Sequence, residues 1–317
     1  MLSILSDTEY LFLSTVAKSM NMGILTEVNN IQEINRALFL KATVIGINNR
    51  NLHDLSIDIT RTKKLAPLIP NNIPIISESG IFSYFQVRKL SKVVNGFLIG
   101  SSLMQANDLD SAICKVTMGN NKVWGLTREQ DAKISKQVGA VYGGLIFIKS
   151  SKRYINLHCA SKIVDIANLK YVGVFKNEKI NNIVFIATQL SLHAVQLHGN
   201  ENQDYINILR DKLPITVNIW KAFSITNTIP DCNWFNVNYY LFDNLSGGSG
   251  KSFNWSILPK NNFKNVLLSG GLHYGNCFLA SQLGFSGLDL NSGIEDRYGI
   301  KNHKKIVSVF NILRNYY

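Results

Sequence analysis

The chain has 317 residues, of which 46% are hydrophobic and 17% charged, and its formal net charge is +12. A chain of this length and composition can bury a large core, which excludes an intrinsically disordered protein. No apolar run approaches the ~20 residues of a membrane-spanning helix, and the start MLSILSDTEY lacks the basic segment of a signal peptide. We expect a cytoplasmic globular protein without a membrane anchor.

In the first 120 residues, about five short apolar runs predict strands separated by helices. Ser6 and Glu9 have the spacing of a capping box for the first helix. Two complete barrels would need ~400 residues or more, so this part is expected to be either a partial (β/α)₈ barrel or a different fold. The runs are MLSIL (1–5), GILTEV (23–28), TVIGINNR (43–50), IPIISESGI (73–81) and NGFLIGSSLM (95–104).

From residue 120 to residue 317, eight such runs alternate with stretches long enough for helices. This alternation is typical of a complete but compact (β/α)₈ TIM barrel, whose lower size limit is ~200 residues. Thr127 and Gln130 have capping-box spacing at the start of the first of these helices, and Gly139 lies near its end. The runs are 122–127, 143–149, 171–175, 194–199, 217–223, 239–243, 265–271 and 287–293.

Polar residues and glycines gather at the carboxyl ends of these eight runs, where a (β/α)₈ barrel holds its active site. Glycine turns after the last two strands predict a phosphate site made by backbone N–H groups. Asp243 is interpreted as a positioned acid, although it could cap its loop. Gln196 and His198 could instead be satisfied polar groups, and Arg153 a solvated loop charge. The strand-end residues are Trp124, Arg153, Gln196, His198, Lys221, Asp243, Gly270, Gly271, Asp289, Ser292 and Gly293.

The stretch DNLSGGSGKSFNW (243–255) raises the possibility of a nucleotide-binding phosphate loop. A Walker A loop reads G-x-x-x-x-G-K-[ST], and with Gly250 and Lys251 in place its first glycine would stand at position 245. That residue is Leu245, which argues against an NTPase. We therefore interpret the loop as a mobile lid or wall beside the pocket.

The basic residues are scattered, with only two short clusters, RTKK (61–64) and KNHKK (301–305). This distribution favours small phosphorylated substrates over nucleic acid. The cysteines are widely spaced and form no C-x-x-C pair, which predicts buried thiols and no disulfide framework or zinc site. They are Cys114, Cys159, Cys232 and Cys277.

Taken in order, these motifs resemble two enzyme families of tryptophan biosynthesis. Residues 120–317 resemble phosphoribosylanthranilate isomerase through GLTREQDAK, SKRYI, VQLHGNE, IWKAF, LLSGGL and GLDLNSGIE. Residues 1–116 resemble the second half of indole-3-glycerol-phosphate synthase through LTEV, IGINNRNL, ISESGI and FLIGSSLM. The order implies a bifunctional, monomeric enzyme that acts on small phosphorylated substrates. We expect it to bind neither nucleic acid nor membranes and to require no metal or organic cofactor.

For the isomerase half, the resemblance implies an Amadori rearrangement of phosphoribosylanthranilate. Asp243 matches the general acid that protonates the ribose ring oxygen. Arg153 matches the residue that binds the anthranilate carboxylate. The phosphate site is matched by Gly270, Gly271, Ser292 and Gly293, and Gln196 and Asp289 are further candidates for substrate binding.

The isomerase half departs from the family at one strand end. The family's general base is a cysteine at the end of the first strand, and this chain has Trp124 there, whose indole cannot act as a base. His198 is the nearby titratable group that could replace it. We therefore expect severely reduced isomerase turnover, and an alternative function as a catalytically impaired relic that keeps the barrel and the phosphate site.

For the synthase half, the resemblance implies ring closure with decarboxylation to indole-3-glycerol phosphate. Glu27 matches a catalytic carboxylate. The family also uses two lysines, on its first and third strands. Both lysines are missing here together with the first three strands. We interpret this as a truncated reading frame, a start site placed too late, or gene decay. The other matched positions are Asn48, Arg50, Glu78 and Ser79, with Gly100 and Ser101 at the phosphate turn.

Overall fold

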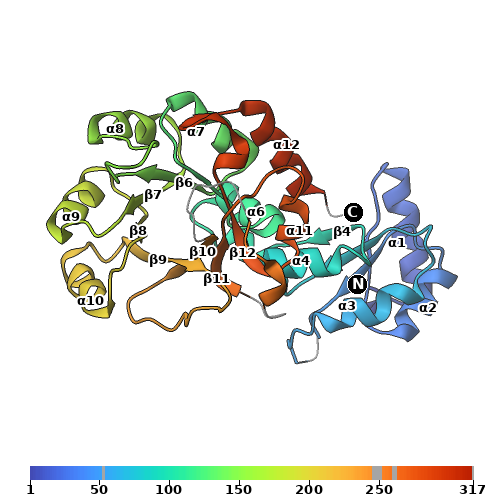
Figure 1. Cartoon of the computed structure of the whole chain (residues 1–317). Coiled ribbons are helices and arrows are strands. Elements are labelled where there is room, and N and C mark those ends of the chain that lie inside the picture. The colour runs from blue at the N-terminus through green and yellow to red at the C-terminus, as the bar shows by residue number, and fades with distance from the viewer. Residues whose placement is uncertain (52–53, 245–251, 259–262, 316–317) are drawn as a thin grey trace. The chain divides into compact units, whose positions relative to one another are not determined.

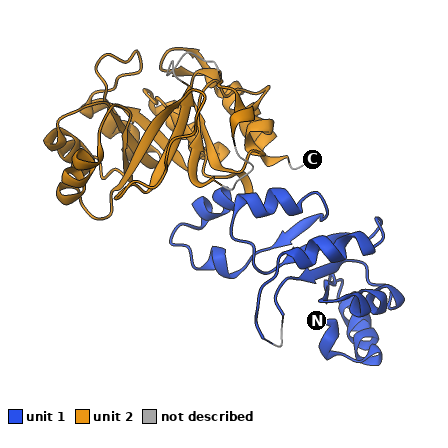
Figure 2. Cartoon of the chain, turned by 60° about the horizontal axis from the view of Figure 1, so that its bottom comes forward, with its two compact units in different colours: residues 1–116, 316–317 blue, residues 117–315 orange. Residues whose placement is uncertain are grey.

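The computed structural model describes residues 1–51, 54–244, 252–258 and 263–315. The chain forms two compact units, one of residues 1–116 and one of residues 117–315 (Figure 1, Figure 2). The glycine loop at 245–251, for which a lid was expected, lies outside the described residues. Within the described part of the chain, no helix has both the length and the apolar character needed to cross a bilayer.

The first unit contains a four-stranded parallel sheet in the order β1-β2-β3-β4. Ile45 and Ile47 of β2 are fully buried and pack with Ile34 and Ala37 of α2 in one hydrophobic core. The elements are η1 (Leu2–Ile4), α1 (Asp7–Ser19), β1 (Thr26–Val28), α2 (Ile31–Phe39), β2 (Ile45–Asn48), α3 (Thr60–Leu65), η2 (Ala66–Leu68), β3 (Ile75–Glu78), α4 (Tyr84–Leu90), β4 (Gly96–Leu98), α5 (Ser101–Met104) and α6 (Leu109–Met118).

One predicted strand of this unit is wrong. MLSIL (1–5) does not join the sheet; residues Leu2–Ile4 form a 3₁₀ turn, and Leu2 is buried in the core. The run is only five residues long, and periodicity alone cannot distinguish a strand from a turn of helix at that length. The capping box that follows it is confirmed, because the Ser6 side chain accepts from the Glu9 backbone N–H and Glu9 bonds back to Ser6.

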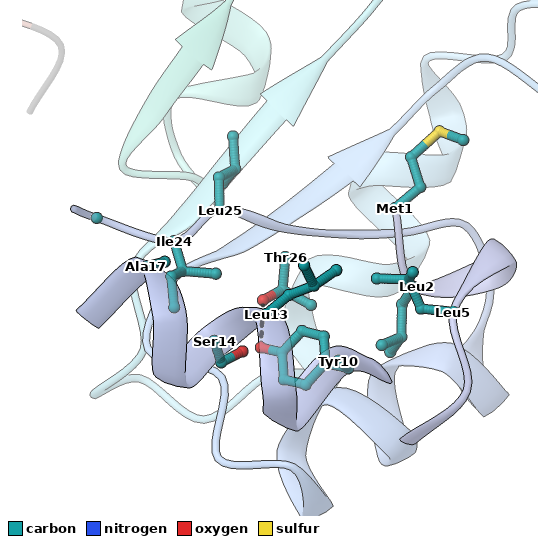
Figure 3. Close-up of a pocket in the computed structure, with 11 residues that line it drawn as sticks. Met1, Leu2, Leu5, Tyr10, Leu13, Ser14, Ala17, Ile24, Leu25 and Thr26 are labelled. Carbon is teal, nitrogen blue, oxygen red and sulfur yellow. Dashed lines mark hydrogen bonds between the residues drawn. The ribbon is translucent and has the colours of Figure 1, made fainter. Parts of the chain in front are cut away.

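A small pocket lined by residues 1–26 lies between α1 and the start of β1 (Figure 3). Its volume is about 280 Å³. Tyr10 crosses it from α1, and its hydroxyl lies 2.8 Å from the Thr26 hydroxyl. This contact ties the helix to the first strand. The lining residues are Met1, Leu2, Leu5, Tyr10, Leu13, Ser14, Ala17, Gly23, Ile24, Leu25 and Thr26.

The second unit is a closed barrel of eight parallel strands, as predicted. The barrel closes where β12 pairs with β5, with Asp289 opposite Lys122. Figure 1 shows α7 to α10 arranged around the outside of the strands. The barrel strands are β5 (Lys122–Trp124), β6 (Tyr142–Ile146), β7 (Lys170–Phe175), β8 (Ala194–Leu197), β9 (Asn218–Ile225), β10 (Tyr239–Asn244), β11 (Phe263–Leu268) and β12 (Phe285–Leu290).

A hairpin of two short antiparallel strands, β13 and β14, follows the last barrel strand and precedes the final helix. It had no counterpart among the predicted strands, and it brings two charged side chains to the barrel mouth. The remaining elements of this unit are α7 (Glu129–Val138), α8 (Leu157–Ile166), α9 (Ile180–Gln189), α10 (Gln203–Lys212), η3 (Trp255–Ile257), α11 (Cys277–Ser281), η4 (Ser292–Ile294), β13 (Glu295–Arg297), β14 (Ile300–Lys301) and α12 (His303–Arg314).

The structure confirms the predicted C-terminal end of α7 but not its predicted N-terminal capping box. Gly139 ends the helix in the left-handed conformation with φ +99°, as expected of a glycine cap. The capping box of Thr127 and Gln130 is wrong, because the N-cap residue is Arg128 and it makes no side-chain cap. The Thr127 hydroxyl donates instead to the carbonyl of Gly299, so a tertiary contact takes the group that local spacing had assigned to the helix.

Candidate active site

Asp243 lies at the carboxyl end of β10 and is 2% exposed. Its Oδ1 accepts a hydrogen bond of 2.8 Å from the backbone N–H of Asn244. Its buried Oδ2 has no hydrogen-bond partner among the described residues. Burial raises the pKa of Asp243 to about 6, the negative charge of Asp289 adds to the rise, and the bond from Asn244 opposes it. A carboxyl group with one fixed oxygen and one free oxygen is suited to donate a proton.

One of the two glycine turns lies beside this acid, and the second turn packs against the first. Gly270 and Gly271 follow β11 with φ values of +90° and +61°, which a residue with a side chain adopts only under strain. A Cβ on Gly270 would stand 3.2 Å from Asp243 Oδ1. A Cβ on Gly293, after β12, would stand 2.1 Å from the carbonyl oxygen of Leu272. The turn after β12 therefore packs on the segment that follows the turn after β11, and Gly270 of the latter turn borders Asp243.

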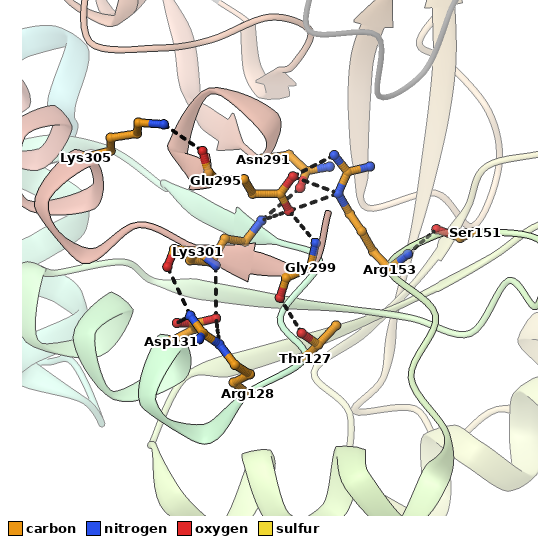
Figure 4. A network of polar contacts seen from close by, with 10 residues as sticks. All are labelled: Thr127, Arg128, Asp131, Ser151, Arg153, Asn291, Glu295, Gly299, Lys301 and Lys305. Atoms are coloured by element: carbon orange, nitrogen blue, oxygen red, sulfur yellow. Dashed lines mark hydrogen bonds and ion pairs between the residues drawn. The ribbon is translucent and has the colours of Figure 1, made fainter. Parts of the chain in front are cut away.

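Arg153 is buried in an ion-pair network and is not the solvated loop charge that the sequence left open (Figure 4). Its Nη2 lies 2.7 Å and its Nε 2.9 Å from the two carboxylate oxygens of Glu295, a bidentate pair. Lys301 Nζ lies 2.8 Å from Glu295 and 2.9 Å from the side-chain oxygen of Asn291. The network holds the guanidinium in one position at the barrel mouth.

The charges of this network shift one another's pKa values. Burial tends to raise the pKa of Glu295, but the bonds from Arg153 and the charge of Lys301 lower it below its usual range. Burial lowers the pKa of Lys301 to about 8, against the opposing effect of Glu295. Because Glu295 stays ionised, an incoming carboxylate would meet a guanidinium that is already paired.

Gln196 and Asp289, both candidates for substrate binding, lie inside the barrel and contact the same lysine. Lys122 Nζ donates to Gln196 Oε1 at 2.6 Å and lies 3.3 Å from Asp289 Oδ2. All three side chains are almost fully buried. Burial lowers the pKa of Lys122, and it raises the pKa of Asp289 despite the neighbouring lysine. Gln196 Nε2 lies 3.1 Å from Nδ1 of His198.

Trp124 fills part of the barrel mouth at the end of β5. Its indole stacks on the imidazole of His198, with ring centroids 5.4 Å apart and planes inclined by 15°. A Cβ on Gly144 would stand 2.7 Å from Trp124 Cδ1, so the glycine of the neighbouring strand leaves the room that the indole occupies. His198 Nε2 in turn lies 3.8 Å from Asp243 Oδ2. His198 therefore connects Trp124 with the candidate acid Asp243.

In the first unit, two carboxylates share the carboxyl ends of the strands. The side chain of Glu78 is buried, and its Oε1 has no hydrogen-bond partner among the described residues. A Cβ on Gly46 would stand 1.8 Å from that oxygen, so only glycine leaves space for it. Burial raises the pKa of Glu78 to about 7, and the negative charge of Glu27 adds to the rise. Glu78 therefore holds a proton near neutral pH.

The other candidates of the first unit follow strands β2 to β4. The Asn48 side chain accepts from the backbone N–H of Arg50, whose guanidinium donates to the carbonyl of Leu55. Ser79 has φ +65°, in the left-handed region that a serine rarely adopts. The two remaining positions, Gly100 and Ser101, stand at the start of α5.

We predict that Glu78→Gln stabilises the first unit in alkaline solution. The folded-state pKa of about 7 exceeds the unfolded value of 4.5, so ionisation costs stability as the pH rises through this window. A neutral amide removes that cost, and we expect a gain on the order of 1 kcal/mol at pH 8 after solvent screening and a smaller gain at pH 5. Urea unfolding followed at both pH values measures it.

The control for this prediction is Asp110→Asn on the exposed face of α6, which also removes one negative charge. An equal gain in that variant would assign the effect to net charge. A loss of stability in Glu78→Gln at pH 8 would contradict the raised pKa of Glu78.

Three site residues were missed by sequence reasoning. Lys122 precedes Trp124 by two residues in a strand, so both side chains point to the same face, and this alternation could have placed the lysine inside the barrel. Glu295 and Lys301 belong to the hairpin after β12, and no local signal pairs them with Arg153. Among the described residues, no group of three or more His, Cys, Asp or Glu side chains is arranged to hold a metal ion.

A closed parallel barrel with a buried acid beside a glycine turn at its carboxyl end defines a (β/α)₈-barrel enzyme of the kind that binds sugar phosphates. The family model described as N-(5'phosphoribosyl)anthranilate (PRA) isomerase matches residues 121–312. The model of indole-3-glycerol phosphate synthase matches residues 1–116. The chain therefore belongs to the family of bifunctional tryptophan biosynthesis proteins that join these two enzymes.

Relatives that carry both parts match nearly the whole chain. The tryptophan biosynthesis protein TrpCF of Buchnera aphidicola subsp. Acyrthosiphon pisum is 57% identical over 99% of this chain and 69% of its own length. The TrpCF protein of Salmonella typhi is 52% identical over 100% of this chain and 70% of its own length. The chain thus spans about two thirds of the length of these relatives.

Solved structures match the second unit. Phosphoribosyl anthranilate isomerase from Thermotoga maritima is 30% identical, covers 62% of this chain and 98% of its own, and has a TM-score of 0.54. The isomerase from Thermus thermophilus is 25% identical, covers 61% of this chain and 98% of its own, and has a TM-score of 0.56.

Proposed function

We propose that the chain is a tryptophan biosynthesis enzyme whose second unit isomerises N-(5-phosphoribosyl)anthranilate to carboxyphenylamino-deoxyribulose phosphate. The observation that carries this proposal is Asp243, a buried carboxyl group with a pKa of about 6 that borders the Gly270 turn. Opening the ribose ring requires a proton on the ring oxygen, and a protonated carboxyl group shielded from water supplies it. Membership of the isomerase family supports the assignment.

The other side chains of the mouth have roles in binding. The turns at Gly270, Gly271, Ser292 and Gly293 bind the phosphate through backbone N–H groups. Arg153 binds the anthranilate carboxylate through its guanidinium. Because Glu295 already occupies that guanidinium, substrate binding involves a carboxylate sharing or replacing the Glu295 contact.

Residues 120–317 form the isomerase domain, and residues 1–116 form the later part of an indole-3-glycerol-phosphate synthase barrel. The four parallel strands of the first unit support this assignment. Glu27 is the catalytic carboxylate of the synthase. The synthase reaction closes the indole ring with loss of carbon dioxide. Asn48, Arg50, Glu78 and Ser79 contact the substrate, and Gly100 with Ser101 binds its phosphate. We further propose a monomeric, cytoplasmic protein that needs no cofactor.

The test is conversion of N-(5-phosphoribosyl)anthranilate by the purified full chain, with the product identified by chromatography and mass spectrometry. We expect conversion above the uncatalysed rate, and its loss in Asp243→Asn. Equal rates for the chain, the variant and buffer would reject the isomerase assignment. Supplying carboxyphenylamino-deoxyribulose phosphate in the same way tests for indole-3-glycerol phosphate and thus for the synthase.

A second candidate function is a catalytically impaired barrel that keeps the phosphate site. The relatives give it no support. One observation favours it: Trp124 fills the position of the family's catalytic cysteine, and its stacked partner His198 lies next to Asp243. Binding of the substrate without turnover would distinguish this candidate from the active enzyme.

The proposed acid predicts a pH dependence. The folded-state pKa of Asp243 is about 6, and the acid form is the one that donates a proton. The acid-dependent step is therefore fastest below about pH 6 and slows as the pH rises, approaching tenfold per pH unit well above it. We expect this limb in log(kcat/KM) between pH 5.5 and 8, measured in buffers of equal ionic strength. A rate that stays constant over that range would contradict Asp243 as the acid.

A further inference from the structure

A series of polar contacts, which we call the relay, joins Lys122, Gln196 and His198 inside the barrel and leads to the candidate acid. Lys122 Nζ lies 2.6 Å from Gln196 Oε1, and Gln196 Nε2 lies 3.1 Å from His198 Nδ1. On its other side, His198 Nε2 lies 3.8 Å from Asp243 Oδ2. Lys122 and Gln196 are fully buried, so both depend on these partners to satisfy their polar groups.

Each group in this chain fixes the orientation of the next. Lys122 is paired with the carboxylate of Asp289, and a lysine ammonium has hydrogen-bond donors and no acceptor. The amide of Gln196 must therefore turn its oxygen to the lysine and its NH₂ group to the imidazole. A donor facing Nδ1 requires a lone pair there, so the proton of neutral His198 sits on Nε2.

We propose that Lys122 and Gln196 are positioning residues that hold His198 in its Nε2–H tautomer, so that the imidazole presents a hydrogen-bond donor to Asp243. This inference rests on the proposed function of Asp243 as the acid. It also assigns Gln196 a role within the barrel wall in place of a direct contact with substrate.

The tautomer has a consequence for the chemistry. After Asp243 gives up its proton, the new carboxylate is buried and its Oδ2 needs a donor. The Nε2–H of His198 is 3.8 Å away and can close on it. The same tautomer removes His198 as a replacement general base, since the lone pair of Nδ1 is engaged and Nε2 carries the proton.

The surroundings keep the imidazole neutral. Burial and the positive charge of Lys122 lower the pKa of His198 to about 4, against the opposing effect of Glu201. Trp124 covers one face of the ring. Lys122 and Gln196 are fully buried, and hydrogen bonds in such a low-dielectric interior are stronger than in water.

The test reads the tautomer directly by ¹⁵N NMR of the full chain labelled at histidine. His198→Asn identifies the resonances of His198 among those of the six histidines. We expect the Nε2–H pattern at pH 7.5 in the unaltered chain. Gln196→Glu puts a carboxylate oxygen where the amide donor stood, and we expect the proton to move to Nδ1.

Kinetics supply the second readout. A misoriented imidazole leaves the binding groups in place, so Gln196→Glu should lower the isomerase kcat by about 10- to 100-fold with little change in KM. The matched control is Gln130→Glu, an exposed glutamine in the first turn of α7, which should change neither the tautomer nor kcat.

Two results would overturn the inference. One is an Nδ1–H or doubly protonated His198 in the unaltered chain, a measurement that needs no folded variant. The other is an unchanged tautomer in folded Gln196→Glu. A chain that shows the Nε2–H tautomer but no turnover would instead count against the proposed function and leave the relay standing.

Discussion

Asp243→Asn is expected to lower the isomerase kcat by a factor of ~10²–10⁴, the usual contribution of a general acid. Asparagine has the same shape and keeps an oxygen to accept the bond from the backbone N–H of Asn244. Its amide nitrogen cannot transfer a proton to the ribose ring oxygen. The glycine turns that we propose to bind the phosphate are unaltered, so KM should change little. Steady-state kinetics at pH 6 measures both constants.

Stability separates a lost acid from a damaged fold. The folded-state pKa of about 6 lies above the unfolded value of 3.8, so at pH 8 the ionised carboxylate of Asp243 destabilises the folded barrel. The neutral amide removes this penalty, and Asp243→Asn should raise the unfolding temperature at pH 8 while it lowers activity.

The control variant is Asp211→Asn, an exposed position in the last turn of α10, which should leave kcat unchanged. A normal kcat in Asp243→Asn would show that another group donates the proton. A lower unfolding temperature with lower activity would assign the effect to structure.

The barrel was predictable because its strands are buried on both faces and therefore appear as continuous apolar runs. β7 contains YVGVF (171–175), and all five of these residues are buried. Such runs recur at a regular interval, which helices must span. The first residues, MLSIL, carry the same composition but belong to a turn, because a short run does not record whether a neighbouring strand is present to pair with it.

The candidate acid and the glycine turns could be located because a parallel barrel brings the carboxyl ends of its strands to one rim. The contacts that the site residues make could not be predicted from the sequence. The pairing of Arg153 with Glu295 joins residues 142 positions apart, and it depends on a hairpin that no periodic signal marks. Gln196 occupies a strand end in the sequence, yet its side chain points into the barrel and contacts Lys122. Strand position gives the rim, and packing decides which side chains face the substrate.

Trp124 occupies the strand end at which the isomerase family has its catalytic cysteine. The indole belongs to one hydrophobic cluster with Ile146 and Val174 and stacks on the imidazole of His198. Its Nε1 is buried without a hydrogen-bond partner among the described residues. An unsatisfied polar atom at a barrel mouth costs stability, so the position is not optimised for packing alone.

Trp124→Cys is expected to raise isomerase turnover by ~10²–10⁴, the usual contribution of a general base. A thiol at the end of β5 can ionise and remove the proton from ribose carbon 2, whereas an indole cannot. The smaller side chain also opens the mouth, at a cost in stability of roughly 3–5 kcal/mol for the cavity. Trp124→Ser makes nearly the same cavity without a thiolate, so it isolates the chemical effect. A gain confined to cysteine identifies the missing base, an equal gain in both variants identifies steric blocking by the indole, and no gain in either means that this enzyme removes the proton with a different group.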